Sequence, residues 1–135
     1  MAKVIGIGGL MFKSPDPKGL AAWYDRVLGM TPASWGGVWF PAEATAAWPG
    51  AGTVFNAMKA DTDYFAPSER DFMINLMVDD LDAMLARCAE HGVTPVKLFP
   101  DEVNGRFAHI MDPDGRKIEL WQPKPMPAAA AVESN

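Results

Sequence analysis

The sequence feature that most constrains the fold is an internal repeat. Two segments with helical periodicity, Pro17–Leu28 and Leu81–His91, each carry apolar residues along one face. Each is preceded by an aspartate and followed by a glycine, with an offset of 63 residues between the copies: Asp16 and Gly29, then Asp79 and Gly92. Asp80 is the alternative cap of the second helix. Two copies are too few for a solenoid, so the sequence predicts one duplicated unit of a helix with its strands.

Strand-like segments accompany both helices. The first half contains three of them, at Val4–Lys13, Ala33–Phe40 and Gly52–Lys59. The second half contains four, at Phe72–Val78, Thr94–Phe99, Gly105–Met111 and Lys117–Trp121. The pattern predicts an α+β fold of two tandem modules, residues 3–60 and 71–122, joined by the polar segment 61–70. The Pro- and Ala-rich tail, residues 124–135, is predicted to be disordered.

Composition excludes several kinds of site and partner. A chain of 135 residues, 49% of them hydrophobic, has the size and character of one globular domain, which we place at residues 1–123. One cysteine excludes an intrachain disulfide and Cys-rich zinc sites, and two histidines exclude a three-histidine metal site. The net charge of -5 argues against nucleic acid as a partner. No apolar run reaches the roughly 18 residues that span a bilayer, so we expect a cytoplasmic protein without a membrane partner.

A strong turn signal lies near the C-terminus, at Asp112–Pro113–Asp114–Gly115. Proline suits the second position of a type I turn, and glycine suits the left-handed residue that follows. A three-residue loop with a glycine bulge would place His109 opposite Glu119 on the neighbouring strand. A two-residue loop would instead place Ala108 opposite Glu119 and separate the two titratable groups.

Alternation along the predicted strands separates two faces of a sheet. One face is apolar and suited to lie under helices; it carries Ala108, Ile110, Ile118 and Leu120. The other face mixes aromatic, sulfur-containing and polar side chains, as a small-molecule cavity does. From this face and from the first strand we predict the substrate-binding residues Met11, Met73, Asn75, Phe107 and Trp121.

His109 and Glu119 are the predicted catalytic residues, because a carboxylate orients an imidazole that acts as a base. A buried histidine that is simply satisfied by its neighbour is the alternative. Cys88, on the apolar face of the second helix, is interpreted as a core residue, and His91, at the end of that helix, as a surface residue. Three aromatic side chains of the first half are expected to pack in the core or a dimer interface, or else to form a stacking wall: Trp35, Trp39 and Phe40.

Several motifs, in this order along the chain, resemble the vicinal oxygen chelate superfamily of glyoxalases, bleomycin resistance proteins and extradiol dioxygenases. They are Ser14–Pro15–Asp16–Pro17, Trp23–Tyr24, Val27–Leu28–Gly29, Val78–Asp79–Asp80–Leu81, Gly105–Arg106–Phe107, Asp112–Pro113–Asp114–Gly115 and Ile118–Glu119–Leu120. The resemblance covers residues 3–122. It implies two βαβββ modules that form an eight-stranded, cup-shaped mixed sheet with the helices on its outer face, in a homodimer.

The resemblance also implies a divalent metal held by His, Glu or Gln side chains, which provides Lewis-acid chemistry. Glu119 matches the carboxylate ligand of the last strand. The other ligand positions fall on residues that bind metals poorly: Gly9, Met73 (or Phe72, with a shift of one residue) and the segment Gly52–Met58, where Asn56 is the weak substitute. One carboxylate with neutral or soft groups makes a poor divalent-metal site, so the resemblance is to a member with a degenerate metal site.

The sequence therefore predicts a glyoxalase-like protein without a cofactor, which binds or acts on a small organic ligand near His109 and Glu119. The alternative is a divalent-metal-dependent lyase or dioxygenase in which Glu119 is a metal ligand and His109 assists it. A third interpretation is an interaction module whose cup is filled by its own side chains.

Overall fold

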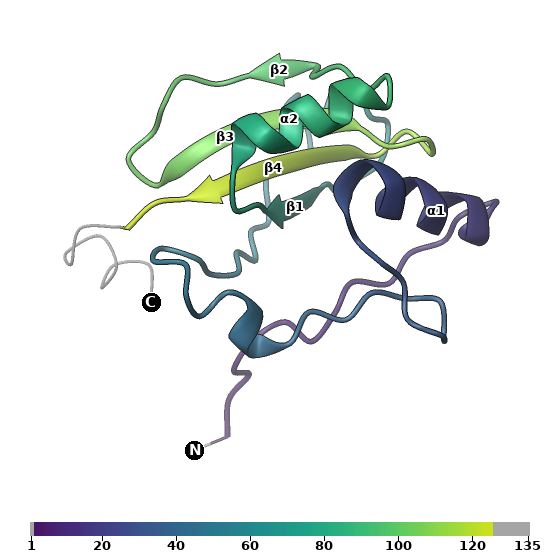
Figure 1. Cartoon of the computed structure of the whole chain (residues 1–135). Coiled ribbons are helices and arrows are strands. Elements are labelled where there is room, and N and C mark those ends of the chain that lie inside the picture. Colours follow the sequence, from purple (N-terminus) through teal and green to yellow (C-terminus); the bar gives the residue numbers. More distant parts are fainter. Residues whose placement is uncertain (1, 126–135) are drawn as a thin grey trace.

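The computed structural model describes residues 2–125, which form an α+β fold with a four-stranded sheet and two α-helices (Figure 1). The helices are α1 (Pro17–Leu28) and α2 (Leu81–Glu90), with a short 3-10 helix, η1, at Ala42–Ala44. The strands are β1 (Ile74–Met77), β2 (Lys97–Leu98), β3 (Gly105–Met111) and β4 (Lys117–Pro123). Among residues 2–125, no helix has the length and apolar character needed to cross a bilayer. Most of the tail predicted to be disordered, residues 126–135, lies outside the described residues.

An aspartate caps the start of each helix, and a glycine follows the end of each, as the sequence predicted. Asp16 caps α1 by accepting a hydrogen bond (3.1 Å) from the backbone N–H three residues later, and Gly29 ends it with a φ of 72°. Asp80, not Asp79, caps α2 in the same way (3.0 Å), and His91 is the C-cap of α2. The spacing between the two caps, Asp16 and Asp80, is therefore one residue larger than the spacing between the two glycines, Gly29 and Gly92.

The sheet has the strand order β1-β4-β3-β2, in which β1 is parallel to β4 and the other pairs are antiparallel. β3 and β4 pair in the predicted register, with His109 opposite Glu119 and Phe107 opposite Trp121. The loop between them has Gly115 in the left-handed region, at a φ of 81°. The prediction of a three-residue loop with a glycine bulge is therefore confirmed, and with it the pairing of the two titratable residues.

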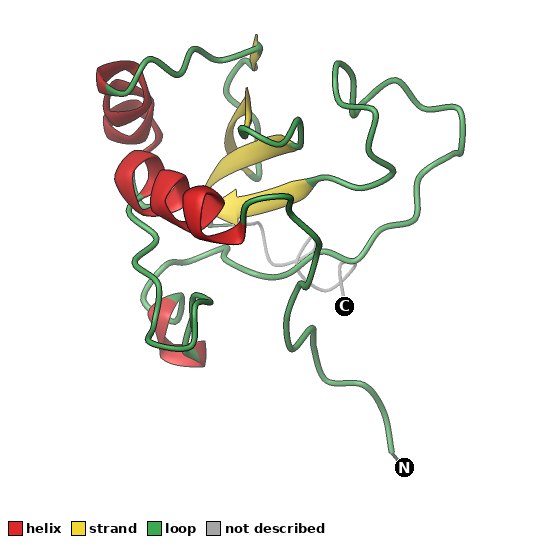
Figure 2. Ribbon diagram, turned by 90° about the vertical axis from the view of Figure 1, so that its right-hand side faces the viewer, coloured by secondary structure: helices red, strands yellow, loops and turns green. Residues whose placement is uncertain are grey.

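The core lies between the two α-helices and one face of the sheet. Both helices cover the same face (Figure 2). That face is the one predicted from alternation, and four of its side chains are 0% exposed: Ala108, Ile110, Ile118 and Leu120. From the helices they meet a complementary apolar set: Leu20, Tyr24, Val27, Leu28, Leu81 and Cys88. Burial raises the pKa of the Cys88 thiol, as the interpretation of this residue as part of the core requires.

The first half of the chain does not form the predicted strands. Residues 4–13, 33–40 and 52–59 run outside the sheet, and none of them pairs as a strand within residues 2–125 (Figure 1). Their apolar side chains are largely exposed, Val4 at 89% and Phe55 at 91%. A strand needs a neighbouring strand for its backbone N–H and C=O groups, and the described part of one chain offers none to these segments. The described residues of one chain therefore form a four-stranded sheet, and the predicted eight-stranded cup is not seen in them.

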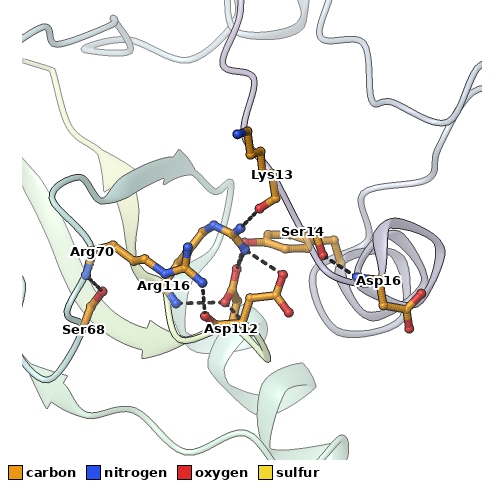
Figure 3. A network of polar contacts seen from close by, with 9 residues as sticks. Lys13, Ser14, Asp16, Ser68, Arg70, Asp112 and Arg116 are labelled. Carbon is orange, nitrogen blue, oxygen red and sulfur yellow. Dashed lines mark hydrogen bonds and ion pairs between the residues drawn. The ribbon is translucent and has the colours of Figure 1, made fainter.

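A buried carboxylate, Asp112, holds the β3–β4 turn to the rest of the molecule (Figure 3). One of its oxygens accepts hydrogen bonds from the backbone N–H groups of Asp114 and Arg116 (both 2.9 Å). The other accepts from the hydroxyl of Tyr24 in α1 (2.8 Å) and from the Arg116 guanidinium (3.1 Å). Arg116 is itself fully buried and also donates to the backbone carbonyl of Lys13. This network joins the turn, α1 and the segment before α1.

Replacing Asp112 with alanine is expected to lower the free energy of unfolding by about 3 kcal/mol, because Arg116 would lose its buried counter-charge and Tyr24 its acceptor. Urea unfolding followed by circular dichroism measures the change. Asp71→Ala, at an exposed position, is the control and should cost less than about 0.5 kcal/mol. A loss for Asp112→Ala no larger than that of the control would show that the turn does not depend on this carboxylate.

Candidate functional site

A hydrogen-bonded carboxylate, that of Glu119, lies on the sheet face opposite the helices. Its Oε2 lies 2.8 Å from Nε2 of His109 and accepts a hydrogen bond from the hydroxyl of Tyr64 (2.5 Å). Its Oε1 accepts one from the side-chain amide of Asn75 (2.8 Å). The side chain of Glu119 is 13% exposed and that of His109 is 0% exposed. These four residues are called the Glu119 cluster; His109 and the Glu119 carboxylate are its buried part, Tyr64 is half-buried, and Asn75 is exposed.

Strand register places three members of the Glu119 cluster. His109 lies opposite Glu119 across β3 and β4, and Asn75 lies opposite it across β1 and β4. Alternate residues of a strand point to the same face, so a short amide and an imidazole approach the carboxylate from its two sides. The fourth member, Tyr64, comes from the segment that joins the two halves of the chain, and the sequence did not predict it. Its signal was the aromatic pair Tyr64–Phe65 in an otherwise polar segment.

The pKa of Glu119 lies below its ordinary value. Burial alone would raise this pKa, but hydrogen bonds from His109, Tyr64 and Asn75 stabilise the charged form by more. Glu119 is therefore an ionised acceptor at neutral pH. Burial and the contact with Glu119 raise the pKa of Tyr64, so its phenol stays a donor.

The two ring nitrogens of His109 have different surroundings. An ionised carboxylate only accepts hydrogen bonds, so Nε2 carries the hydrogen of the bond to Glu119. The other nitrogen, Nδ1, is buried without a hydrogen-bond partner among residues 2–125. The His109 ring contacts two aromatic rings edge-to-face. Its centre lies 5.2 Å from that of the Tyr64 ring and 4.7 Å from that of the Phe99 ring. The imidazole is thus fixed in place by packing and by Glu119.

Aromatic rings extend the site along the same face. The rings of Phe107 and Trp121 lie 6° from parallel, with their centres 6.1 Å apart. The ring of Phe99 meets that of Phe107 edge-to-face at 6.4 Å. The indole N–H of Trp121 donates to the backbone carbonyl of Asn104 (3.0 Å) and so fixes the ring. These three aromatic residues, the aromatic wall, place flat apolar surface beside an ionised carboxylate.

Two basic residues hold the segment 61–70, hereafter the strap, against the sheet. The ammonium group of Lys117 donates to the backbone carbonyls of Tyr64 (2.7 Å) and Ala66 (2.8 Å). Burial lowers the pKa of Lys117. At the end of the strap, the Arg70 guanidinium donates to the backbone carbonyl of Asp114 (2.9 Å), near the turn shown in Figure 3. The strap is therefore attached through the backbone carbonyls of Tyr64 and Ala66 and through the side chain of Arg70, and the Tyr64 side chain lies against Glu119.

The predicted substrate-binding residues divide into two groups. Asn75, Phe107 and Trp121 lie on the expected face, in or beside the Glu119 cluster. Met73 is half-buried directly before β1. Met11 is 90% exposed in the first-half segment, which runs outside the sheet within residues 2–125. The prediction of Met11 as a substrate contact rests on a first strand, which the described residues 2–125 do not form.

A sequence model of one protein family matches residues 9–121, and that family is the glyoxalase-like domain. The chain belongs to the glyoxalase-like domain family. This membership confirms the resemblance to the vicinal oxygen chelate superfamily that the motifs indicated. The match runs through both halves of the repeat and includes every residue of the Glu119 cluster.

Several solved structures resemble this glyoxalase-like protein. A segment of TnmS3, an antibiotic-binding protein from Streptomyces sp. CB03234, is 41% identical; the match covers 38% of this chain and only 41% of TnmS3, with a TM-score of 0.35. A glyoxalase/bleomycin resistance protein from Catenulispora acidiphila DSM 44928 is 24% identical over 79% of this chain and 89% of its own, with a TM-score of 0.42. A protein from the mobile metagenome of V. pseudocholerae is 20% identical over 84% of this chain and 98% of its own, with a TM-score of 0.46. A search of curated proteins finds no significant match.

The donor atoms of this glyoxalase-like protein do not fit the metal centre that its superfamily implies. Such a centre needs three or four protein ligands, and Glu119 and His109 would provide two of them. The His109 nitrogen that faces Glu119 carries a hydrogen, so it has no free lone pair for a metal ion. Within residues 2–125, no three His, Cys, Asp or Glu side chains come together in a way that could hold a metal ion. Gly9 and Asn56, at two further ligand positions, lie in the exposed first-half segments.

Two hollows in the described surface lie away from the Glu119 cluster. One, of about 360 Å³, runs along α1 and is lined by Lys18 and Pro32 among others. The other, of about 330 Å³, lies near the β3–β4 turn and is lined in part by Pro67 and Arg70. Neither is lined by a residue of the cluster. Volume alone would favour the hollows, but a desolvated ionised group beside aromatic rings is the stronger indication of a binding site.

The lowered pKa of Glu119 predicts how its contribution to stability depends on pH. The hydrogen bonds to the ionised form stabilise the fold above the ordinary pKa of a glutamate, about 4.3, and this stabilisation is lost as the pH falls through the lower folded-state pKa. Wild type should therefore exceed Glu119→Gln in free energy of unfolding by about 1–3 kcal/mol at pH 7, and the difference should shrink as the pH falls below the ordinary pKa of a glutamate. Urea unfolding of both proteins at several pH values measures it. A difference that stays constant or grows as the pH falls would contradict the assignment.

Proposed function

We propose that this glyoxalase-like protein binds a small organic molecule against the Glu119 cluster and the aromatic wall, and that it does so without a metal ion. The proposal rests on one observation, an ionised and nearly buried carboxylate beside parallel aromatic rings. Such a surface suits a planar, mostly apolar ligand that carries a hydrogen-bond donor, because ring contacts supply affinity and the carboxylate supplies orientation.

The geometry favours binding over catalysis by His109. A general base needs an accessible lone pair within hydrogen-bond reach of the substrate. Nε2 of His109 is occupied as a donor to Glu119, and Nδ1 is buried away from the surface. His109 therefore acts as a fixed support that keeps Glu119 ionised and oriented. Glu119 is the group that remains to meet a ligand.

The donor set also supports a metal-free site. All the hydrogen-bond donors around Glu119 are arranged toward its oxygens, and they would oppose a cation at the same place. The alternative function, a metal-dependent lyase or dioxygenase, needs further ligands that the described residues do not bring to Glu119.

Binding is tested with a set of neutral planar aromatic alcohols and amines, using the quenching of tryptophan fluorescence. We expect saturable binding that His109→Ala and Phe107→Ala each weaken by about tenfold or more, since one loosens Glu119 and the other removes half of the parallel ring pair. His91→Ala, which removes the other histidine at an exposed position, is the matched control and should bind as wild type does.

Two results would contradict this proposal. Binding that survives both His109→Ala and Phe107→Ala would place the ligand elsewhere. Purified protein that holds a stoichiometric transition metal, and loses its ligand binding on treatment with a chelator, would favour the metal-dependent alternative.

We further propose that the protein is a homodimer in which the first-half segments acquire the strand partners that one chain lacks, giving the eight-stranded cup. The four most exposed aromatic side chains of these segments are Trp35 (69%), Trp39 (71%), Phe40 (60%) and Phe55 (91%). At roughly 150–250 Å² for each side chain, they account for several hundred Å², a large part of the roughly 800 Å² per partner in a stable interface. The outer edge of β1 is also unpaired within the described sheet and is open to a further strand. A cytoplasmic location and the lack of a nucleic-acid partner stay predictions from composition.

The dimer is tested by light scattering coupled to size-exclusion chromatography. Wild type should have twice the mass of the 14.7 kDa chain. Trp39→Glu should shift the protein toward monomer, because a charge would be buried in the interface, while Ala86→Glu on the exposed side of α2 should leave the mass unchanged. A wild-type protein that is monomeric at about 100 µM would refute the dimer.

A further inference from the structure

The phenol of Tyr64 already contacts the carboxylate of Glu119. The Tyr64 hydroxyl donates to Oε2 at 2.5 Å, and the Tyr64 ring packs edge-to-face against His109. The ring and hydroxyl of Tyr64 therefore lie where an aromatic ligand with a hydroxyl group would make its contacts with the site. With Asn75 and His109 as the other donors, the carboxylate has three of its roughly four acceptor positions filled.

The three donors differ in how firmly the fold holds them. His109 is fully buried on β3, which pairs with strands on both sides, and Asn75 lies on β1. Tyr64 lies on the strap, which contains turns but neither helix nor strand. Segments of this kind open at a lower free energy than paired strands do. Tyr64 is therefore the one of the three donors whose backbone lies outside a helix or strand.

The strap can release the Tyr64 side chain without detaching from the sheet. Lys117 holds the strap through the backbone carbonyls of Tyr64 and Ala66, and Arg70 holds it through the backbone of Asp114. None of these bonds involves the Tyr64 hydroxyl. Rotation of one side chain would uncover Glu119 and leave the strap attached.

We propose that Tyr64 is a built-in occupant of the site, and that the ligand is a planar aromatic molecule with a phenolic hydroxyl, which replaces the Tyr64 hydroxyl on Glu119. This inference rests on the proposed function and specifies its ligand class and its entry step. A ligand without a donor would displace Tyr64 and leave an ionised, desolvated carboxylate short of one hydrogen bond, which is unfavourable. The exchange thus selects for the hydroxyl group and not only for flat apolar shape.

The test compares 2-naphthol with 2-methoxynaphthalene, which has the same ring system but no donor. Isothermal titration calorimetry measures both with wild type, Tyr64→Phe, Glu119→Gln and Tyr24→Phe. Tyr24→Phe is the matched control, because the hydroxyl of the chain's other tyrosine also donates to a carboxylate, that of Asp112, on the opposite side of the sheet.

We expect wild type to prefer 2-naphthol by about tenfold. Tyr64→Phe should bind 2-naphthol about three- to tenfold more tightly than wild type, because the competing donor is gone. Glu119→Gln should lose most of the preference, and Tyr24→Phe should bind as wild type does. In hydrogen exchange, 2-naphthol should increase the exchange of the backbone amides near Tyr64 and leave the sheet protected.

The outcomes separate this inference from the proposed function. If 2-naphthol binds wild type and Tyr64→Phe equally, and Glu119→Gln still weakens it, the exchange is wrong and the proposed site stands. Weaker binding by Tyr64→Phe would make Tyr64 a direct ligand contact and would also overturn the exchange. If 2-naphthol binds neither protein, the phenolic class is wrong, and the proposed function falls with it only if the wider set of aromatic alcohols and amines also fails to bind.

Discussion

The interaction on which the rest of this structure depends is the set of four hydrogen bonds to the carboxylate of Asp112. Two of them close the turn between β3 and β4 and so fix the register of the hairpin. The other two come from Tyr24 of α1 and from the buried Arg116. A shift of one residue in this register would turn every side chain of one strand to the opposite face. The turn therefore decides both that Ile118 and Leu120 meet the helices and that Glu119 meets His109 on the other side.

Function follows from what that register leaves on the face opposite the helices. A glutamate in this position would be costly to bury alone, and three donors offset the cost and keep it ionised. Two of these donors come from strands and are part of the scaffold, while the third, Tyr64, comes from the strap. The Glu119 carboxylate is thus ionised and in contact with the Tyr64 hydroxyl. In this glyoxalase-like domain, the carboxylate that matches a superfamily metal ligand accepts hydrogen bonds from the three donors.

The sequence predicted the parts of the fold whose signals are local. Helix caps such as Asp16, the Asp112–Gly115 turn and the alternation of β3 and β4 each act over a few residues, and the structure confirms them. The sequence did not predict the hydrogen bond from Tyr64 to Glu119 or the one from Arg116 to the Lys13 carbonyl. The partners are separated by 55 positions in the first case and 103 in the second, and contacts this far apart leave no periodic pattern. The first-half strands fail for a different reason. Alternation shows that a segment can form a strand, but a strand also needs a partner, and no local pattern says whether that partner lies in the same chain.

The most direct test of this account is a crystal structure of the protein with 2-naphthol. The account predicts that the naphthol oxygen lies within about 2.6–3.0 Å of Glu119, that its rings lie against Phe107 and Trp121, and that the Tyr64 hydroxyl has moved off the carboxylate. A complex in which the Tyr64–Glu119 hydrogen bond is intact and the naphthol occupies the hollow along α1 would contradict it.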